Sequence, residues 1–150
     1  MPSDLMQLLY RGDRPAAALL ARERDLDVFE AAALGALEVL IERCEEDSSR
    51  VSAYAEDGWT PLHLAAFFGN LDIARELLRR DAVIDARSLS GNVTPLQSAC
   101  AGDHTLLASL LIAAGADVNA RQESGHTALD SARRNGNAEI VELLSVAGAT

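Results

Sequence analysis

Residues 57–66 read Asp57-Gly58-Trp59-Thr60-Pro61-Leu62-His63-Leu64-Ala65-Ala66, and this stretch decides the fold because the chain repeats it. Its Thr-Pro-Leu core returns at Thr94 after 34 residues, and a Thr-Ala-Leu version follows at Thr127 after another 33. A glycine lies just before each of these threonines. Markers that stay in register over three segments indicate an internal repeat, and a period of this length is typical of stacked repeat units.

The chemistry of each repeat is that of two short helices. The hydroxyls of Thr60 and Thr94 are suited to cap helix N–H groups, and the prolines that follow them fit the first helical turn, where no N–H is needed. Residues 71–78 carry apolar side chains at positions i, i+1, i+4 and i+5, which indicates a second helix. We therefore expect an all-α chain in which no unit buries its apolar face alone and stacking buries it collectively.

Residues 57–70 and the segment Gly115-Ala116-Asp117-Val118-Asn119-Ala120 resemble the ankyrin repeat pattern. The resemblance covers residues 55–150 well and continues more weakly at Glu30-Ala31-Ala32-Ala33-Leu34-Gly35 and at Leu8-Leu9-Tyr10-Arg11-Gly12-Asp13. It implies an ankyrin-repeat solenoid of stacked helix-turn-helix units with projecting hairpin loops.

We expect a single domain with five parts. These are an N-terminal helical cap (1–25), a degenerate repeat (26–54), two repeats (55–87 and 88–120) and a C-terminal capping repeat (121–150). Gly12 lies only 23 residues before Gly35, so the hairpin loop between them is expected to be missing, which leaves a bare helix pair as the cap.

Four residues depart from the family pattern. Asp81 and Asp103 stand where a loop glycine and a turn glycine are usual, and Asn92 belongs to a loop one residue longer than the norm. Arg133 stands where the resemblance implies a small core alanine. These departures bear on local turn geometry and not on the fold.

The composition favours a soluble, helical protein that does not bind nucleic acid or membrane. Hydrophobic residues make up 49% of the chain and aromatic residues only 4%, so much of the apolar content is alanine and leucine, which suits closely packed helices. The net charge is −10, and no more than two basic residues are adjacent, so polyanions and anionic lipids would be repelled. All 13 basic residues are arginine, a bias typical of GC-rich genomes, and we expect a bacterial source.

The N-terminus lacks the basic and apolar regions of a signal peptide, and no apolar run is long enough for a transmembrane helix. We therefore expect a cytoplasmic protein. Cys44 and Cys100 are read as buried thiols in that reducing compartment and not as a disulfide or metal pair.

Nothing in the sequence forms a catalytic, cofactor or metal site. The resemblance implies that His63 bonds neighbouring loops, and His104 and His126 have no paired ligand at metal-binding spacing. No nucleophile lies near a recognisable base, and no Gly-rich phosphate loop is present. We expect no enzyme activity, no cofactor and no metal.

The resemblance also implies where a partner binds. In this architecture the residues before each turn glycine and those at each hairpin tip face a concave groove. Of the six aromatic residues, five fall in or beside this strip, and exposed aromatic clusters are typical of interface hot spots. The candidate partner-binding residues are Tyr10, Leu34, Tyr54, Glu56, Asp57, Trp59, Phe67, Phe68, Leu89, Asn92, His126 and Arg134. Phe67 and Phe68 are also compatible with packing between helices.

The leading hypothesis is a non-catalytic protein-protein interaction module, expected to be monomeric. Its partner would meet the aromatic centre of the groove and an acidic rim of Glu56, Asp57, Asp85 and Glu123. The alternative is an inhibitor or immunity-type protein that masks a basic enzyme surface by charge. That alternative predicts strong salt dependence and loss of binding on charge reversal, whereas the groove hypothesis predicts loss on truncation of aromatic side chains.

The repeat alignment predicts two free thiols per chain. Cys44 and Cys100 lie two units apart, and packed helices are about 10 Å apart per unit, which exceeds the ~7 Å between Cα atoms that a disulfide spans. Thiol titration of the denatured, unreduced protein should report both. A monomer without free thiols would contradict the alignment.

Overall fold

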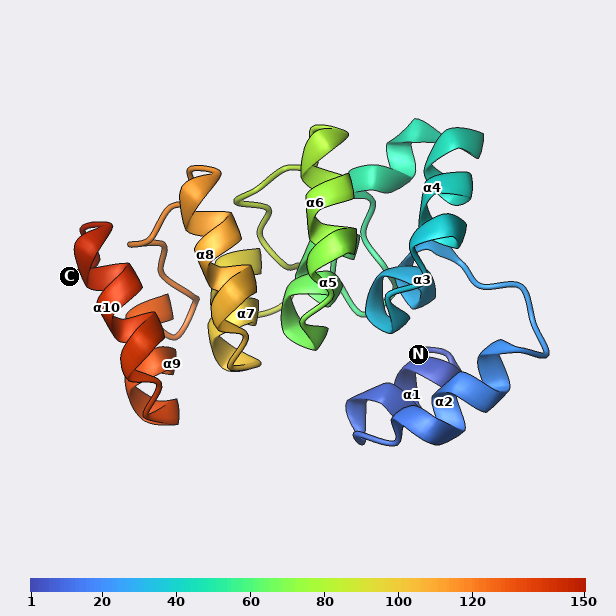
Figure 1. Ribbon diagram of the computed structural model, residues 1–150, viewed down its shortest axis with the longest axis horizontal. Coiled ribbons are helices and arrows are strands. Elements are labelled where there is room, and N and C mark those ends of the chain that lie inside the picture. The colour runs from blue at the N-terminus through green and yellow to red at the C-terminus, as the bar shows by residue number, and fades with distance from the viewer.

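The computed structural model describes residues 1–150 and contains only helices, turns and loops (Figure 1). The helices are α1 (Asp4–Tyr10), α2 (Arg14–Ala21), α3 (Val28–Leu34), α4 (Leu37–Glu46), the short 3-10 helix η1 (Ser48–Ser52), α5 (Pro61–Phe68), α6 (Leu71–Arg79), α7 (Pro95–Ala101), α8 (Thr105–Ala113), α9 (Ala128–Asn135) and α10 (Ala138–Val146). The expected all-α, ankyrin-type architecture is confirmed.

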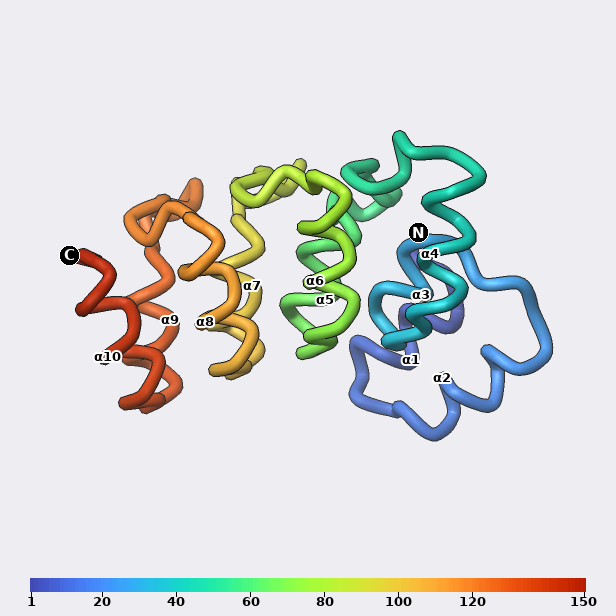
Figure 2. Tube along the Cα trace, turned by 45° about the horizontal axis from the view of Figure 1, so that its top comes forward, coloured from blue at the N-terminus to red at the C-terminus, as the bar shows by residue number.

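Helices α3 to α10 stack in two layers along the long axis of the molecule (Figure 1). One layer contains α3, α5, α7 and α9, which pack on one another in that order, and the other contains α4, α6, α8 and α10. Figure 2 shows the same succession of helix pairs from a second direction. Large apolar side chains from successive units join one continuous core, among them Leu40, Leu62, Leu77, Leu96 and Leu111, each 1% exposed or less. The stack thus buries apolar surface that no single helix pair could bury alone.

The first-layer helices of the repeats share one kind of start. In α5 the Thr60 hydroxyl accepts the His63 backbone N–H, and His63 Nδ1 accepts the Thr60 backbone N–H at 3.2 Å. The same reciprocal pattern starts α7 and α9, through the pairs Thr94–Gln97 and Thr127–Asp130. This is the expected threonine cap, extended to a full capping box.

The side chain of the third residue of these helices also determines which backbone carbonyls outside its own helix it is hydrogen-bonded to. Because His63 Nδ1 accepts, its Nε2 carries the proton and donates to the Val93 carbonyl of the next unit at 2.8 Å. Gln97 Nε2 donates in the same way to the His126 carbonyl of the next unit at 3.3 Å, and also to the Ala120 carbonyl at the end of its own unit at 2.7 Å. Asp130 lies in the last of the units described, and its carboxylate closes only its own cap. The structural role expected for His63 is thus observed.

The hairpin loops are joined through their backbones. Leu89 N–H donates to the Gly58 carbonyl at 3.0 Å, and Glu123 N–H donates to the Gly91 carbonyl at 2.9 Å. Gly58 has a φ of 86°, and a Cβ there would lie 2.9 Å from the Leu89 Cβ. The glycine before the threonine is therefore required twice, for the left-handed turn and for the close approach of the next hairpin.

The departures from the family pattern are absorbed locally. Asp81, Asn92 and Asp103 each adopt a left-handed conformation, with φ of 61°, 56° and 63°. Asn and Asp tolerate this region better than other non-glycine residues, so the turns keep their shape. Arg133 lies in α9, and its side chain is exposed to solvent.

The N-terminal pair lies off the row of the other helices (Figure 1). α1 and α2 are joined by a turn at Gly12, with a φ of 81°, and residues 22–27 lead to α3 without a hairpin loop. α1 packs on α3 and α2 packs on α1. The buried side chains of Leu5 and Leu9 belong to the same core as the repeats.

Both cysteines are buried and unpaired, Cys44 in α4 and Cys100 in α7. Burial raises the pKa of the Cys100 thiol to about 12, which makes it a packing residue and not a nucleophile. No helix in the chain is long and apolar enough to cross a membrane.

Burial lowers the pKa of the buried His63 imidazole. The unfolded chain therefore binds more protons than the folded chain below about pH 6.5, and stability falls as the pH falls through that region. His63→Gln keeps both hydrogen bonds, as Gln97 shows, and should remove up to about 1.4 kcal/mol per pH unit of this dependence. Urea unfolding of both proteins between pH 5 and pH 7.5 measures the difference. Parallel curves would contradict the neutral, buried imidazole.

Candidate functional site

An apolar cavity of about 320 Å³ opens between α5 and α7 on their groove side. Its lining comes from α5 and α7, from three hairpin loops and from α1. The residues are Tyr10, Trp59, His63, Leu64, Phe67, Val93, Gln97, Ser98, Ala101 and Gln122. Three of the five aromatic residues expected in the groove strip thus meet at one cavity.

Local structure positions each aromatic wall. Trp59 precedes the cap residue Thr60, and its ring packs edge-on against the His63 ring with centroids 5.4 Å apart. His63 is fixed by hydrogen bonds at both ring nitrogens, so it holds Trp59 in place. Phe67 lies on the last turn of α5 and is 41% exposed. A rigid, partly exposed pair of aromatic rings is suited to receive an apolar side chain.

Tyr10 forms the wall contributed by α1. Its hydroxyl donates to Asp57 Oδ2 at 2.8 Å, and its ring lies 5.8 Å from that of Phe68. Desolvation, reinforced by this hydrogen bond to a carboxylate, raises the pKa of Tyr10 well above its usual value of 10.0. The hydroxyl is therefore a donor at any physiological pH.

The structure corrects the placement of Phe68. The sequence interpretation included both phenylalanines among the groove residues and left open that they pack between helices. Phe68 is only 8% exposed and belongs to the hydrophobic core, with the ring of Tyr10 over it. Adjacent residues on a helix point about 100° apart, so one of two neighbouring side chains faces the groove while the other packs inward.

The other candidate residues lie outside the cavity. Leu34 is half-buried at the end of α3, and Arg134 is exposed at the end of α9. Leu89 is 70% exposed, and Asn92 and His126 are exposed on their hairpins. The exposed Tyr54 donates its hydroxyl to the Arg87 carbonyl at 2.9 Å.

The acidic rim is partly occupied by contacts within the chain. Glu56 Oε2 accepts from the N-terminal amino group at 2.7 Å, Asp57 accepts from Tyr10, and Asp85 Oδ1 accepts the Asp117 N–H. Glu123 is exposed at its hairpin. The rim charges therefore act in part as internal acceptors.

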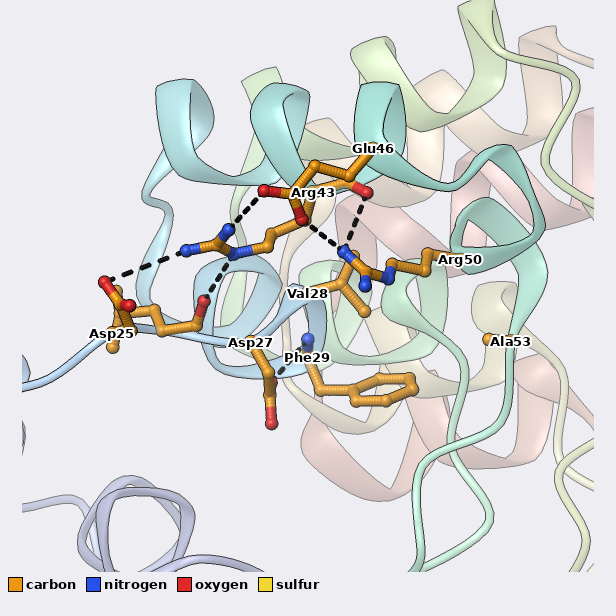
Figure 3. Close-up of a pocket in the computed structure, with 9 residues that line it drawn as sticks. Asp25, Asp27, Val28, Phe29, Arg43, Glu46, Arg50 and Ala53 are labelled. Carbon is orange, nitrogen blue, oxygen red and sulfur yellow. Dashed lines mark hydrogen bonds and ion pairs between the residues drawn. The ribbon is translucent and has the colours of Figure 1, made fainter.

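A second cavity, of about 410 Å³, lies beside the linker and α4, and sequence reasoning missed it (Figure 3). Arg43 donates to the Leu26 carbonyl and to Glu46, and Arg50 pairs with the same carboxylate at 2.7 Å. Asp25 lies 3.8 Å from Arg43. Since each arginine already faces a carboxylate, this cavity offers no free cation to a ligand.

No group of three or more His, Cys, Asp or Glu side chains is arranged to hold a metal ion. The cavity in the groove contains hydrogen-bonded polar groups and aromatic rings but no nucleophile beside a base. Its chemistry is that of a surface that binds through shape and apolar contact.

The family model for ankyrin repeats, in three copies, matches residues 5–122 and 84–149. The chain belongs to the ankyrin repeat family. It is 42% identical over 125 residues to the ankyrin repeat and SAM domain-containing protein 6 of Rattus norvegicus, covering 82% of this chain and 14% of that protein. It is 33% identical over 113 residues to the B-cell lymphoma 3 protein homolog of Mus musculus, covering 75% and 25%. The chain thus spans at most a quarter of the length of these two relatives.

These relatives are animal proteins, and the comparisons give no support to the bacterial source indicated by the arginine bias. Ankyrin repeats are in general protein-protein interaction modules, which agrees with the coarse function expected from the sequence.

The two neighbouring phenylalanines provide a matched test of the groove geometry. Phe68→Ala should cost about 3 kcal/mol or more of unfolding free energy because it empties a core position, while Phe67→Ala should cost about 1 kcal/mol or less. Chemical denaturation of the two variants measures both values. Equal losses would mean that Phe67 is not a groove side chain.

Proposed function

We propose that this chain is a non-catalytic binding module whose groove takes an apolar side chain of a partner protein between Trp59 and Phe67. The observation that carries the proposal is the cavity of about 320 Å³ at the centre of the groove side of the stack. Its aromatic walls are held by the repeat framework itself, so little ordering is needed when a partner binds.

The setting of the cavity supports this function. Hairpin residues around it, including Leu89, Asn92 and His126, are exposed and offer a polar and apolar rim. A desolvated aromatic centre with a wet rim is the usual anatomy of a protein interface. We propose that the module is a monomer in the cytoplasm, where Cys44 and Cys100 stay reduced.

The second candidate function is an acidic inhibitor that masks a basic enzyme surface. The net charge of −10 favours it. The internal contacts of Glu56 and Asp57 weigh against a role for the rim as the main binding surface. The two functions differ in which substitutions abolish binding.

The test uses a partner obtained by pull-down or a peptide selected from a displayed library, with affinity measured by calorimetry. Trp59→Ala and Phe67→Ala should each weaken binding by about 2 kcal/mol or more, roughly thirtyfold, because a hot-spot ring is lost. Binding should change little between 50 and 300 mM salt, since few of the contacts are ionic.

Glu123→Arg and Leu106→Ala are the controls, one on the rim and one exposed on α8 away from the groove. Neither should change affinity more than about twofold. If charge reversal abolishes binding, the affinity falls steeply with salt, and the aromatic variants bind normally, the inhibitor function replaces the groove function.

A further inference from the structure

Residues 1–24, which contain α1 and α2, form the N-terminal segment. The first part of this segment, up to Tyr10, runs along the groove side of α5. Met1 donates through its amino group to Glu56 Oε2 in the hairpin that leads into α5. At the far end of this first part, Tyr10 stacks on Phe68 in the last turn of α5. Between them, Met6 lines a small cavity together with residues of α5 and that hairpin. The segment therefore covers surface of α5 and of its hairpin next to the aromatic cavity, which Tyr10 itself lines.

This segment is attached less extensively than any repeat. Successive repeats pack through helices of both layers, and bonds between neighbouring hairpins also join the units from 55 onward. α1 packs on α3, whereas α2 packs mainly on α1 and buries a single residue, Ala17. One hydrogen bond, from Arg14 to the Phe68 carbonyl at 2.9 Å, joins the start of α2 to α5. Residues 22–27, the link to α3, have no helix or hairpin. The segment is held by the buried face of α1, by a few side-chain contacts and by an irregular link, so fewer contacts break on its release than on separation of two repeats.

Glu30 is the buried anchor of the segment. It is 1% exposed and holds the third helical position of α3, the position of His63 and Gln97 in the next two repeats. Those side chains donate forward to the next unit, but a carboxylate has no proton to donate. Glu30 Oε1 instead accepts from Ser3 Oγ at 2.6 Å and pairs with Arg24 at 3.0 Å. Because this residue is a glutamate, its side chain is hydrogen-bonded to the N-terminal segment that precedes α3 and not to the unit that follows α3.

The segment leaves one acceptor of the groove unsatisfied. Asp57 Oδ2 accepts from Tyr10, but Asp57 Oδ1 is buried and has no hydrogen-bond partner. A tyrosine has one O–H and serves one oxygen, and a buried acceptor without a partner costs free energy. The planar fork of an arginine would serve both oxygens and would also stack on the Phe68 ring.

We propose that the α1–α2 pair is an internal competitor for the groove, displaced by an amphipathic partner helix that presents an arginine to Asp57. The proposal rests on the function proposed above and names the partner chemistry and the regulation of that same groove. The partner helix carries apolar side chains at the spacing of Leu5, Met6 and Leu9, because the surface that receives them is already shaped for that stripe.

The first experiment cuts the link in the otherwise complete chain. A protease recognition sequence is inserted between the exposed residues Arg24 and Asp25, and the cut protein is compared with the uncut one. On dilution, the fragment 1–24 should dissociate with a measurable Kd while the remainder keeps its helical circular dichroism. Glu30→Gln should raise that Kd at least tenfold, because Gln97 shows that glutamine maintains the cap while the charged acceptor is lost.

The second arm tests the arginine. Synthetic peptides of residues 1–24, one native and one with Tyr10→Arg, compete with labelled fragment 1–24 for the cut protein. The Tyr10→Arg peptide should displace the label at a concentration at least tenfold lower than the native peptide. Asp57→Asn in the cut protein should remove that difference, since an amide does not pair with a guanidinium in the same bidentate way.

Each contrary result has a definite meaning. Unfolding of the remainder after the cut, or a fragment that never dissociates, would make the pair an integral part of the fold and overturn the proposal. Equal potency of the two peptides would overturn the partner chemistry. If the ligand of the aromatic cavity binds cut and uncut protein equally, the competition is wrong while the groove function stands. If it binds neither, the groove function itself fails.

Discussion

The side chain at the third position of each first-layer helix is the interaction on which this structure depends. It closes the cap of its own helix and, in α3, α5 and α7, also joins that unit to another part of the chain. His63 and Gln97 donate to carbonyls of the next unit, Asp130 closes only its own cap, and Glu30 accepts from the N-terminal segment. The side chain at this position accepts from the N-terminal segment in α3, donates to the next unit in α5 and α7, and does neither in α9. The hydrogen-bonding role of this position therefore changes with the place of the unit in the stack.

The groove is a consequence of the same framework. Stacking brings Trp59, Phe67 and the start of α7 to one side of the molecule, and the hydrogen bonds of His63 fix the ring on which Trp59 packs. The surface that we propose for binding is built on helix starts that are hydrogen-bonded on both sides, so its apolar walls are pre-organised and remain exposed to solvent without collapse. Function on this fold therefore comes from which side chains occupy the framework and not from the framework itself.

The sequence was sufficient for the repeats because their markers are local and periodic. Each marker, such as Thr60, Pro61 or Gly69, acts on the backbone geometry of residues close to it in the sequence. The structural effect of such residues can therefore be predicted from the sequence alone. The exposures of Phe67 and Phe68 were not separable in this way, because the helix phase and the ring of Tyr10 decide them together. The position of α1 could not be predicted either, because the repeat pattern does not indicate that a helix pair lies beside the row of helices α3 to α10.

Some of the missed information was nevertheless in the sequence. Asp27 and Glu30 have capping-box spacing, and Glu30 aligns with His63 and Gln97. Since His63 and Gln97 both donate from this position, a carboxylate there was a signal that this position of α3 is hydrogen-bonded to a different part of the chain. Tyr10 was predicted beside the groove from its repeat position and lines the aromatic cavity, but its hydrogen bond to Asp57 depends on tertiary contact.

The most direct test of the groove uses Trp59, the only tryptophan in the chain, as a reporter. Acrylamide quenching of its fluorescence is measured with and without a saturating partner peptide. If the partner fills the cavity between Trp59 and Phe67, the quenching constant should fall severalfold on binding and should stay low in 300 mM salt. A partner that binds tightly while leaving the quenching of Trp59 unchanged would contradict the account, because recognition would then take place elsewhere on the molecule.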